Sequence, residues 1–347
     1  MNNITKALAL LLAASTLALA SCGEDKNAKD PESGFSYGTE GDTNKGEDKT
    51  PGSASPDGPK AGDTLEASGF TFTVTEDGCA TVTSYKGEAP AASIPETVSG
   101  IKVTSVGDQA FYENQHLATV NIPDSVVSVG DDAFGKCVNL AQITGAKNLY
   151  DIGSYAFSET ALLEKSTDEF LIIGSDILLD YNGTAKDVTV PDGVRVIASA
   201  FSRNGKIESV ALPEGVVSIC DNAFSQCTAL ESLDLPESLT HIGDRSFSMC
   251  SSLKSITLPK GLSHIGSFAF ANCASLDSLD IPAGVKTIED STFLGCASLA
   301  YIYIPYTVEA IGDMAFSRCS GDLKVHCVVG SPADIYCTEN GLTAIYE

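Results

Sequence analysis

Positively charged side chains are scarce in this chain. Lys and Arg together number 21 against 46 Asp and Glu, which gives a net charge of −25 over 347 residues. Nucleic-acid binding relies on Lys and Arg to displace counterions from phosphates, so this composition argues against a nucleic-acid partner. It also disfavours anionic lipid headgroups as a ligand, and it suits a soluble protein whose copies repel one another.

Catalytic and metal-binding signatures are missing as well. The sequence has no HExxH, Walker or dinucleotide-binding motif, and none of its 11 Cys lies in a CxxC pair. Of the four His, only His241 and His264 share a repeat position, and two ligands without a carboxylate partner are too few to hold a metal ion. We therefore predict no enzymatic activity, no cofactor and no metal site.

A phenylalanine recurs every 23 residues through most of the chain. One run contains three such residues and a second contains six: Phe111, Phe134 and Phe157, then Phe201, Phe224, Phe247, Phe270, Phe293 and Phe316. A fixed period in this range predicts a solenoid, in which each repeat forms one coil. A single coil cannot bury its apolar side chains alone, so the stacked coils must share one core.

Each repeat contains an alternating segment that predicts a strand. In the repeat that ends at Pro282, the alternation places Leu279 and Ile281 toward the core and Ser278 and Asp280 outward. Pro282 should end this strand at a corner of the coil, because proline lacks an amide donor.

A Gly follows the repeat Ile in several coils. It stands at positions 130, 153, 243, 266 and 312, whereas Ala198, Cys220 and Glu289 occupy the same place in other coils. We predict a corner of unusual φ at this position, which favours Gly without requiring it.

The shared string I-G-x-x-A-F-x-x-C-x-x-L-x-x-I-x-I-P resembles the BspA-like leucine-rich repeat. The resemblance extends from about Ile94 to Cys319, roughly two thirds of the chain. It implies a repeat solenoid of the BspA type, a β-strand-rich right-handed coil with short irregular or helical segments. Members of this family are commonly surface or secreted proteins of bacteria and some protists, linked to adhesion or without an assigned role. The resemblance therefore implies binding or adhesion; a structural spacer of the envelope without a dedicated ligand is the alternative.

Composition and pattern divide the chain into five segments. We predict a lipoprotein signal peptide at 1–21, a disordered tether at 22–63, an N-terminal β-hairpin cap at 64–93, the solenoid at 94–322 and a C-terminal cap at 323–347. The cap hairpin should turn at Gly78 and pair Val74 with Ala80 and Phe72 with Val82, because this register places the apolar residues on one face. A second hairpin, inserted at about 165–187, explains the one break in the period.

The first residues carry an export signal. An apolar run too short to span a bilayer ends in Leu19-Ala20-Ser21-Cys22, which looks like a lipobox and predicts lipid attachment at Cys22. The alternative is an ordinary signal peptide with a chance Cys. Acidic residues after Cys22 resemble a surface-export signal, although they could simply begin the acidic linker. We predict an outer-membrane lipoprotein displayed on the cell surface and attached to the membrane through Cys22.

Six cysteines lie three residues after a repeat Phe, and neighbouring coils should stack them into one column. They are Cys137, Cys227, Cys250, Cys273, Cys296 and Cys319. In-register side chains point in parallel, which opposes disulfide formation, and a linear column does not give the tetrahedral closure that zinc needs. We predict buried free thiols that act as small apolar side chains.

The outward strand positions are where a binding surface would lie. They hold Ser, Ala, Asp and Thr in the middle coils, but the last full coil has Tyr301 and Tyr303, with Tyr306 just past Pro305. Exposed aromatic rings are common in protein contacts and can stack on sugar rings. We therefore predict these three Tyr as ligand-binding residues for a protein or glycan of a host or neighbouring cell. The alternative is that they shield the last coil beneath the C-terminal cap.

Overall fold

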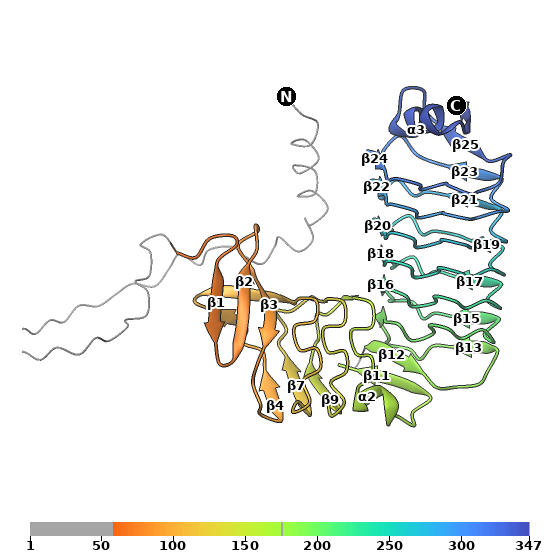
Figure 1. Ribbon diagram of the computed structural model, residues 1–347. Helices are drawn as coiled ribbons and strands as arrows, with labels where there is room; N and C mark the ends of the chain where they lie inside the picture. The colour runs from red at the N-terminus through yellow and green to blue at the C-terminus, as the bar shows by residue number, and fades with distance from the viewer. Residues whose placement is uncertain (1–57, 175, 347) are drawn as a thin grey trace, which may run out of the picture.

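Stacked coils form two arms that meet at an angle (Figure 1). The computed structural model describes residues 58–174 and 176–346. We call residues 64–160 the N-arm, residues 186–346 the C-arm, and the bend between them the elbow. The coils of the two arms are stacked in different directions, and the predicted repeat solenoid is confirmed.

Two walls of strands build the N-arm. Its strands are β1 (Thr64–Ala67), β2 (Phe70–Val74), β3 (Ala80–Tyr85), β4 (Ala91–Ser93), β5 (Thr97–Val98), β6 (Ile101–Val106), β7 (Thr119–Ile122), β8 (Ser128–Val129), β9 (Gln142–Gly145) and β10 (Asp151–Ile152). One wall is the parallel ladder β3-β6-β8-β10, which β1 and β2 extend as antiparallel strands, and the other is β4-β7-β9.

The elbow contains one short helix and a hairpin, and the C-arm then resumes the two-wall pattern. The elbow elements are α2 (Ala161–Glu164), β11 (Phe170–Ile173) and β12 (Ile177–Tyr181). The C-arm elements are β13 (Asp187–Thr189), β14 (Val196–Ile197), β15 (Ser209–Ala211), β16 (Ser218–Ile219), β17 (Ser232–Asp234), β18 (His241–Ile242), β19 (Ser255–Ile256), β20 (His264–Ile265), β21 (Ser278–Asp280), β22 (Thr287–Ile288), β23 (Tyr301–Tyr303), β24 (Ala310–Ile311), β25 (Lys324–Cys327), α3 (Pro332–Asn340) and β26 (Thr343–Tyr346). One wall contains β12-β14-β16-β18-β20 and then β22-β24, and the other contains β13-β15-β17-β19 and then β21-β23-β25-β26.

Both predicted hairpins are confirmed. Between β2 and β3, Phe72 faces Val82 and Val74 faces Ala80, with Gly78 at a φ of 78° in the turn. Strands β11 and β12 pair antiparallel at the elbow. The sequence did not anticipate β1, which adds to the N-terminal hairpin, β5, which pairs antiparallel with β6, or β26, which follows α3 and pairs in parallel with β25.

The repeat Phe residues form the centre of the core. Each is at most 3% exposed, and successive rings within each arm stack with centroids 4.6–5.6 Å apart. Leu279 and Ile281 are buried while Ser278 and Asp280 are exposed, which confirms the predicted alternation. Each coil therefore contributes its apolar side chains to a core that only neighbouring coils can close.

The cysteine column does more than fill space. All six thiols are free; five are buried and Cys319 is half-buried. Each Sγ donates a hydrogen bond, at 3.0–3.2 Å, to the backbone carbonyl of the repeat Phe in the preceding coil. Burial raises the pKa of the Cys227 thiol to about 12, so that this side chain is a neutral donor at neutral pH.

The corner positions hold Gly because a side chain would not fit there. The prediction of an unusual φ at these corners is wrong. None of Gly130, Gly153, Gly243, Gly266 and Gly312 has a positive φ. A Cβ on any of them would lie 2.2–2.6 Å from Oδ1 of an Asp in the preceding coil. That oxygen accepts a hydrogen bond, at 2.6–2.9 Å, from the backbone N–H of the residue after the Gly.

Two of the three exceptions to the glycine column follow the same rule. Cys220 comes one coil after Ser199, and Glu289 comes one coil after Ser267, so no carboxylate fills the space that their side chains need. At the five corners with Gly, the Asp carboxylate of the preceding coil leaves no room for a side chain.

Candidate functional site

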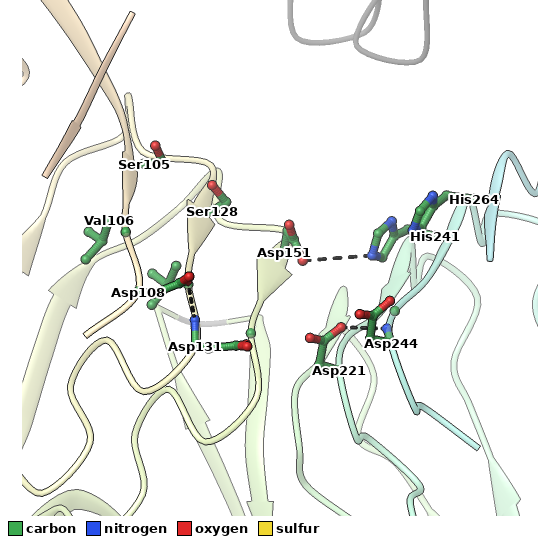
Figure 2. A pocket seen from close by; sticks show the side chains of 15 residues that line it. Ser105, Val106, Asp108, Ser128, Asp131, Asp151, Asp221, His241, Asp244 and His264 are labelled. Carbon is green, nitrogen blue, oxygen red and sulfur yellow. Dashed lines mark hydrogen bonds and ion pairs between the residues drawn. The ribbon is translucent and has the colours of Figure 1, made fainter. Parts of the chain in front are cut away.

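A pocket of about 460 Å³ lies in the inner corner of the elbow, where the N-arm and the C-arm face each other (Figure 2). We call it the corner pocket. Seven titratable side chains line it: Asp108, Asp131 and Asp151 from the N-arm, and Asp221, His241, Asp244 and His264 from the C-arm. Four of the Asp residues come from the corner column described above, which the fold brings to the inside of the bend.

The other three residues belong to a column whose remaining members carry neither charge nor an aromatic ring. This column holds Ser105 and Ser128 in the N-arm, and Val196, Ser218, Thr287 and Ala310 in the C-arm. Asp151, His241 and His264 occupy the same position in their coils. All three line the corner pocket, and Figure 2 shows Asp151 pointing across it toward His241.

The two imidazoles stack, as their shared repeat position predicts. Their ring centroids are 4.6 Å apart with an interplanar angle of 10°. His241 Nε2 lies 3.9 Å from Asp151 Oδ1, and the Tyr150 ring meets His241 edge-on. Sequence reasoning missed Asp151 because it belongs to the other arm and no periodic pattern spans the elbow.

Burial and charge repulsion shape the titration of the pocket. Burial, together with the negative charges of Asp244, Asp151 and Asp131, raises the pKa of Asp221 to about 7. Burial lowers the pKa of His241 to about 3, with an added contribution from His264. The His241 ring is therefore neutral at neutral pH, and its approach to Asp151 is not an ion pair. A pocket with this charge disfavours an anionic ligand.

Direct contacts between the arms support the pocket. Asn222 Nδ2 donates to Ser154 Oγ at 2.8 Å, and Ser154 Oγ lies 3.4 Å from Asp221 Oδ2. The Cys220 thiol donates to the Tyr150 carbonyl at 3.4 Å, and Cys220 packs into the core of the N-arm. The Asp221 carboxylate is thus held between a coil of its own arm and a serine of the other.

An arginine ties the elbow hairpin to both arms. Arg195 Nε donates to Asp176 Oδ2 at 2.8 Å, and its Nη2 donates to the carbonyls of Lys147 and Leu149 at 3.0 and 3.1 Å. These contacts hold β12 and β14 against the last coils of the N-arm, so the bend is a packed joint with its own hydrogen bonds.

The structure brings two of the three predicted tyrosines together. Tyr301 and Tyr303 are half-buried on the outward face of β23, on either side of the buried Ile302. His326 on the neighbouring β25 lies 5.7 Å from the Tyr301 ring and 6.4 Å from the Tyr303 ring, between centroids. Tyr306 is 75% exposed in the following turn. Sequence reasoning had given His326 no role, and binding by the tyrosines stays a prediction.

The remaining site prediction lies outside the described residues. Cys22 and the lipobox precede residue 58, where the description begins. Among the residues that are described, no helix has the length and apolar character to cross a membrane. The same residues contain no group of three or more His, Cys, Asp or Glu arranged to hold a metal ion.

Comparison with known proteins places the chain in a family. A leucine-rich repeat protein of T. pallidum (TpLRR) is similar at 24% identity, over 82% of this chain and 98% of that one, with a TM-score of 0.32. A leucine-rich cell surface protein of Faecalibacterium prausnitzii A2-165 is 25% identical over 81% and 98%, with a TM-score of 0.33. The pneumococcal vaccine antigen PcpA is 16% identical over 83% of this chain and 100% of that one, with a TM-score of 0.43.

No match was found among curated proteins. The family model described as "BspA type Leucine rich repeat region" matches six copies over residues 91–199 and 194–322, and the chain therefore belongs to the BspA-type leucine-rich repeat family.

Proposed function

We propose that this chain is a lipid-anchored binding protein of the cell surface, and that it recognises a protein or glycan through the corner pocket and the tyrosine cluster. One observation carries the binding function. In a column whose other members carry neither charge nor an aromatic ring, Asp151, His241 and His264 are the exceptions, and all three line the same pocket at the elbow. A structural spacer needs no such concentration of chemistry.

The geometry of the corner supports a ligand. A volume of about 460 Å³ falls in the range of small-ligand pockets, and solenoids commonly bind on concave surfaces. The uncompensated carboxylates favour a neutral or positively charged ligand group. A sugar hydroxyl or a polar side chain of a protein would meet carboxylate acceptors from both arms and imidazole nitrogens from the C-arm.

Lipid anchoring and surface display rest on the sequence. The lipobox at Cys22 and the acidic tether after it support attachment at the membrane with the solenoid held away from it. Cys22→Ala should release the protein from the membrane fraction or stall its processing. Protease added to intact cells then tests display, and complete protection would place the solenoid on the periplasmic side.

A glycan and extracellular-matrix protein array, probed with the chain lacking residues 1–22, tests binding. We expect a ligand whose affinity falls at least about tenfold in the triple variant Asp151→Ser/His241→Ser/His264→Ser, which restores the usual residue of the column. Thr287→Ser, in the same column but outside the pocket, is the matched control. An array without any ligand would favour the spacer, and an unaffected triple variant would remove the pocket from the binding site.

A further inference from the structure

One wall of the C-arm has a composition unlike the rest of the chain. It consists of the positions two residues before and two residues after each repeat Phe. Three of the four Arg in the whole sequence lie there, together with two Met and one further Phe. We call these residues the arginine face; they are Arg203, Arg245, Met249, Phe268, Met314 and Arg318.

Carboxylates are absent from this wall of the C-arm, although the chain has 46 of them. Six coils, from the one at Phe201 to the one at Phe316, contribute two such positions each, and none of these positions is Asp or Glu. The N-arm differs, because Glu113, Asp132 and Glu159 stand at the equivalent positions there. The wall therefore changes character at the elbow while the repeat itself continues.

The backbone directs these side chains outward. All six residues of the arginine face have a left-handed φ, between 54° and 63°. The Arg245 N–H donates to the carbonyl of Ser267 in the next coil, which places Arg245 beside Phe268, and its guanidinium carbon lies 4.9 Å from that ring centroid. Met249 and Met314 are 47% and 59% exposed. Cation, aromatic ring and thioether thus share one solvent-facing surface.

The arginines of this face have no carboxylate partner among the described residues. The ion pairs within residues 58–174 and 176–346 include Arg195 with Asp176, but none includes Arg203, Arg245 or Arg318. Arg203 donates to the Tyr155 hydroxyl instead. The neighbouring column contains Asp221, Asp244, Asp290 and Asp313. Oδ1 of the first three accepts a backbone N–H of the next coil.

We propose that the arginine face is a docking surface for a protein partner that presents acidic and apolar side chains. Arg, Met and aromatic residues are enriched in protein interfaces, whereas Lys, Asp and Glu are depleted. Six of the twelve positions of the wall are Arg, Met or Phe, and none is Lys, Asp or Glu. Guanidinium groups without a carboxylate partner in the described part of the chain, on a protein of net charge −25, select an acidic partner by charge complementarity. The inference goes beyond the proposed function, since none of the six residues of the arginine face lines the corner pocket.

Fluorescence anisotropy with three labelled peptides tests the proposal on the chain lacking residues 1–22. The probes are short peptides of alternating Glu and Phe, alternating Ser and Phe, and alternating Lys and Phe. We expect the Glu–Phe peptide to bind at least about tenfold more tightly than the Ser–Phe peptide, and the preference to weaken with added salt. The net charge alone predicts the opposite order, with the Lys–Phe peptide bound best.

Charge reversal locates the surface. Arg245→Glu/Arg318→Glu should weaken the Glu–Phe peptide at least about tenfold, whereas Lys260→Glu/Lys286→Glu, the same change of charge at exposed lysines outside this face, should not. Circular dichroism confirms that both variants fold. Hydrogen exchange should show protection by the peptide at 245–249 and 268–272. Equal binding of the Glu–Phe and Ser–Phe peptides, or an unchanged affinity in the Arg variant, would overturn the proposal.

Discussion

Asp290 and Gly312 form a pair across two neighbouring coils. Oδ1 of Asp290 accepts a hydrogen bond from the N–H of Asp313 at 2.8 Å, and a Cβ on residue 312 would lie 2.4 Å from that same oxygen. The carboxylate therefore occupies the space of the missing side chain, and each residue restricts what the other position can hold.

The first prediction tests this pairing. Gly312→Ala should lower the free energy of unfolding by about 1–3 kcal/mol, because the methyl group must displace the carboxylate or the backbone. In an Asp290→Ser background the same substitution should be much less destabilising, since Glu289 is accommodated one coil after Ser267. Urea denaturation of the four proteins gives the coupling energy. Simple additivity would show that the two positions do not compete for space.

The second prediction concerns the core. Phe247 is fully buried between Phe224 and Phe270, so Phe247→Ala should lower the free energy of unfolding by about 3–5 kcal/mol by leaving a cavity. Hydrogen exchange should show that the adjacent coils lose protection first, because each coil contacts only its neighbours. Met249→Ala, two residues away and exposed, is the control. A loss below about 1 kcal/mol at Phe247 would contradict the core assignment.

The third prediction concerns pH at the elbow. The pKa of Asp221 in the folded protein is about 7, above its ordinary value of 3.8, so the native state binds this proton more tightly than the unfolded chain. The resulting stabilisation is fully present below pH 3.8 and is lost as the pH rises through about 7. Asp221→Asn keeps the site neutral and preserves an acceptor for the Asp244 N–H. The variant should therefore melt at a higher temperature than the wild type at pH 8 but not at pH 4.

Folding lowers the pKa of His241, whereas it raises that of Asp221. The comparison of Asp221→Asn with the wild type must therefore account for His241. Its pKa falls from 6.5 to about 3 on folding, so its stabilisation is present above pH 6.5 and is lost as the pH falls toward 3. Both proteins contain His241, and its contribution cancels in the difference between their melting temperatures. Asp280→Asn, at an exposed strand position, is the control. A difference that does not depend on pH would show that Asp221 is not protonated on folding.

The fourth prediction concerns the tyrosine cluster. If Tyr301, Tyr303 and Tyr306 contact the ligand, Tyr303→Ala should weaken its binding by about 1–3 kcal/mol and leave the melting temperature nearly unchanged. If the rings instead stabilise the last coils through His326, the same variant should melt earlier and bind normally. Calorimetry and a binding assay on one variant separate the two outcomes, and an early-melting protein with intact binding would end the site hypothesis.

Local patterns predicted much of this structure. The 23-residue period located the coils, alternation set the inward residues, and the apolar faces fixed the register of Phe72 with Val82 and of Val74 with Ala80. These features depend on residues that are close in sequence or repeat at a constant interval. The stacking of His241 on His264 belongs to the same class, because one period separates the two residues.

The corner pocket could not be predicted in the same way. Its existence depends on the bend, and the bend depends on how the elbow hairpin packs against both arms, which no period encodes. Asp151 consequently had no visible partner in the sequence. The misassigned glycines have a related cause: their requirement comes from an Asp one coil earlier, and examination of single repeats, one at a time, does not compare those two positions.

The pairing of corner residues also limits how such a gene can change by recombination. Tandem repeats are gained and lost by unequal exchange, which removes or adds whole units. Loss of the 23 residues that carry Gly266 and Ser267 would set Glu289 directly above Asp244, where the preceding coil leaves room only for Gly. Loss of a unit would not affect packing at this corner if the two coils brought together still have compatible corner residues. The order of the coils is therefore constrained, and proteins with the same coils in another order would differ in stability.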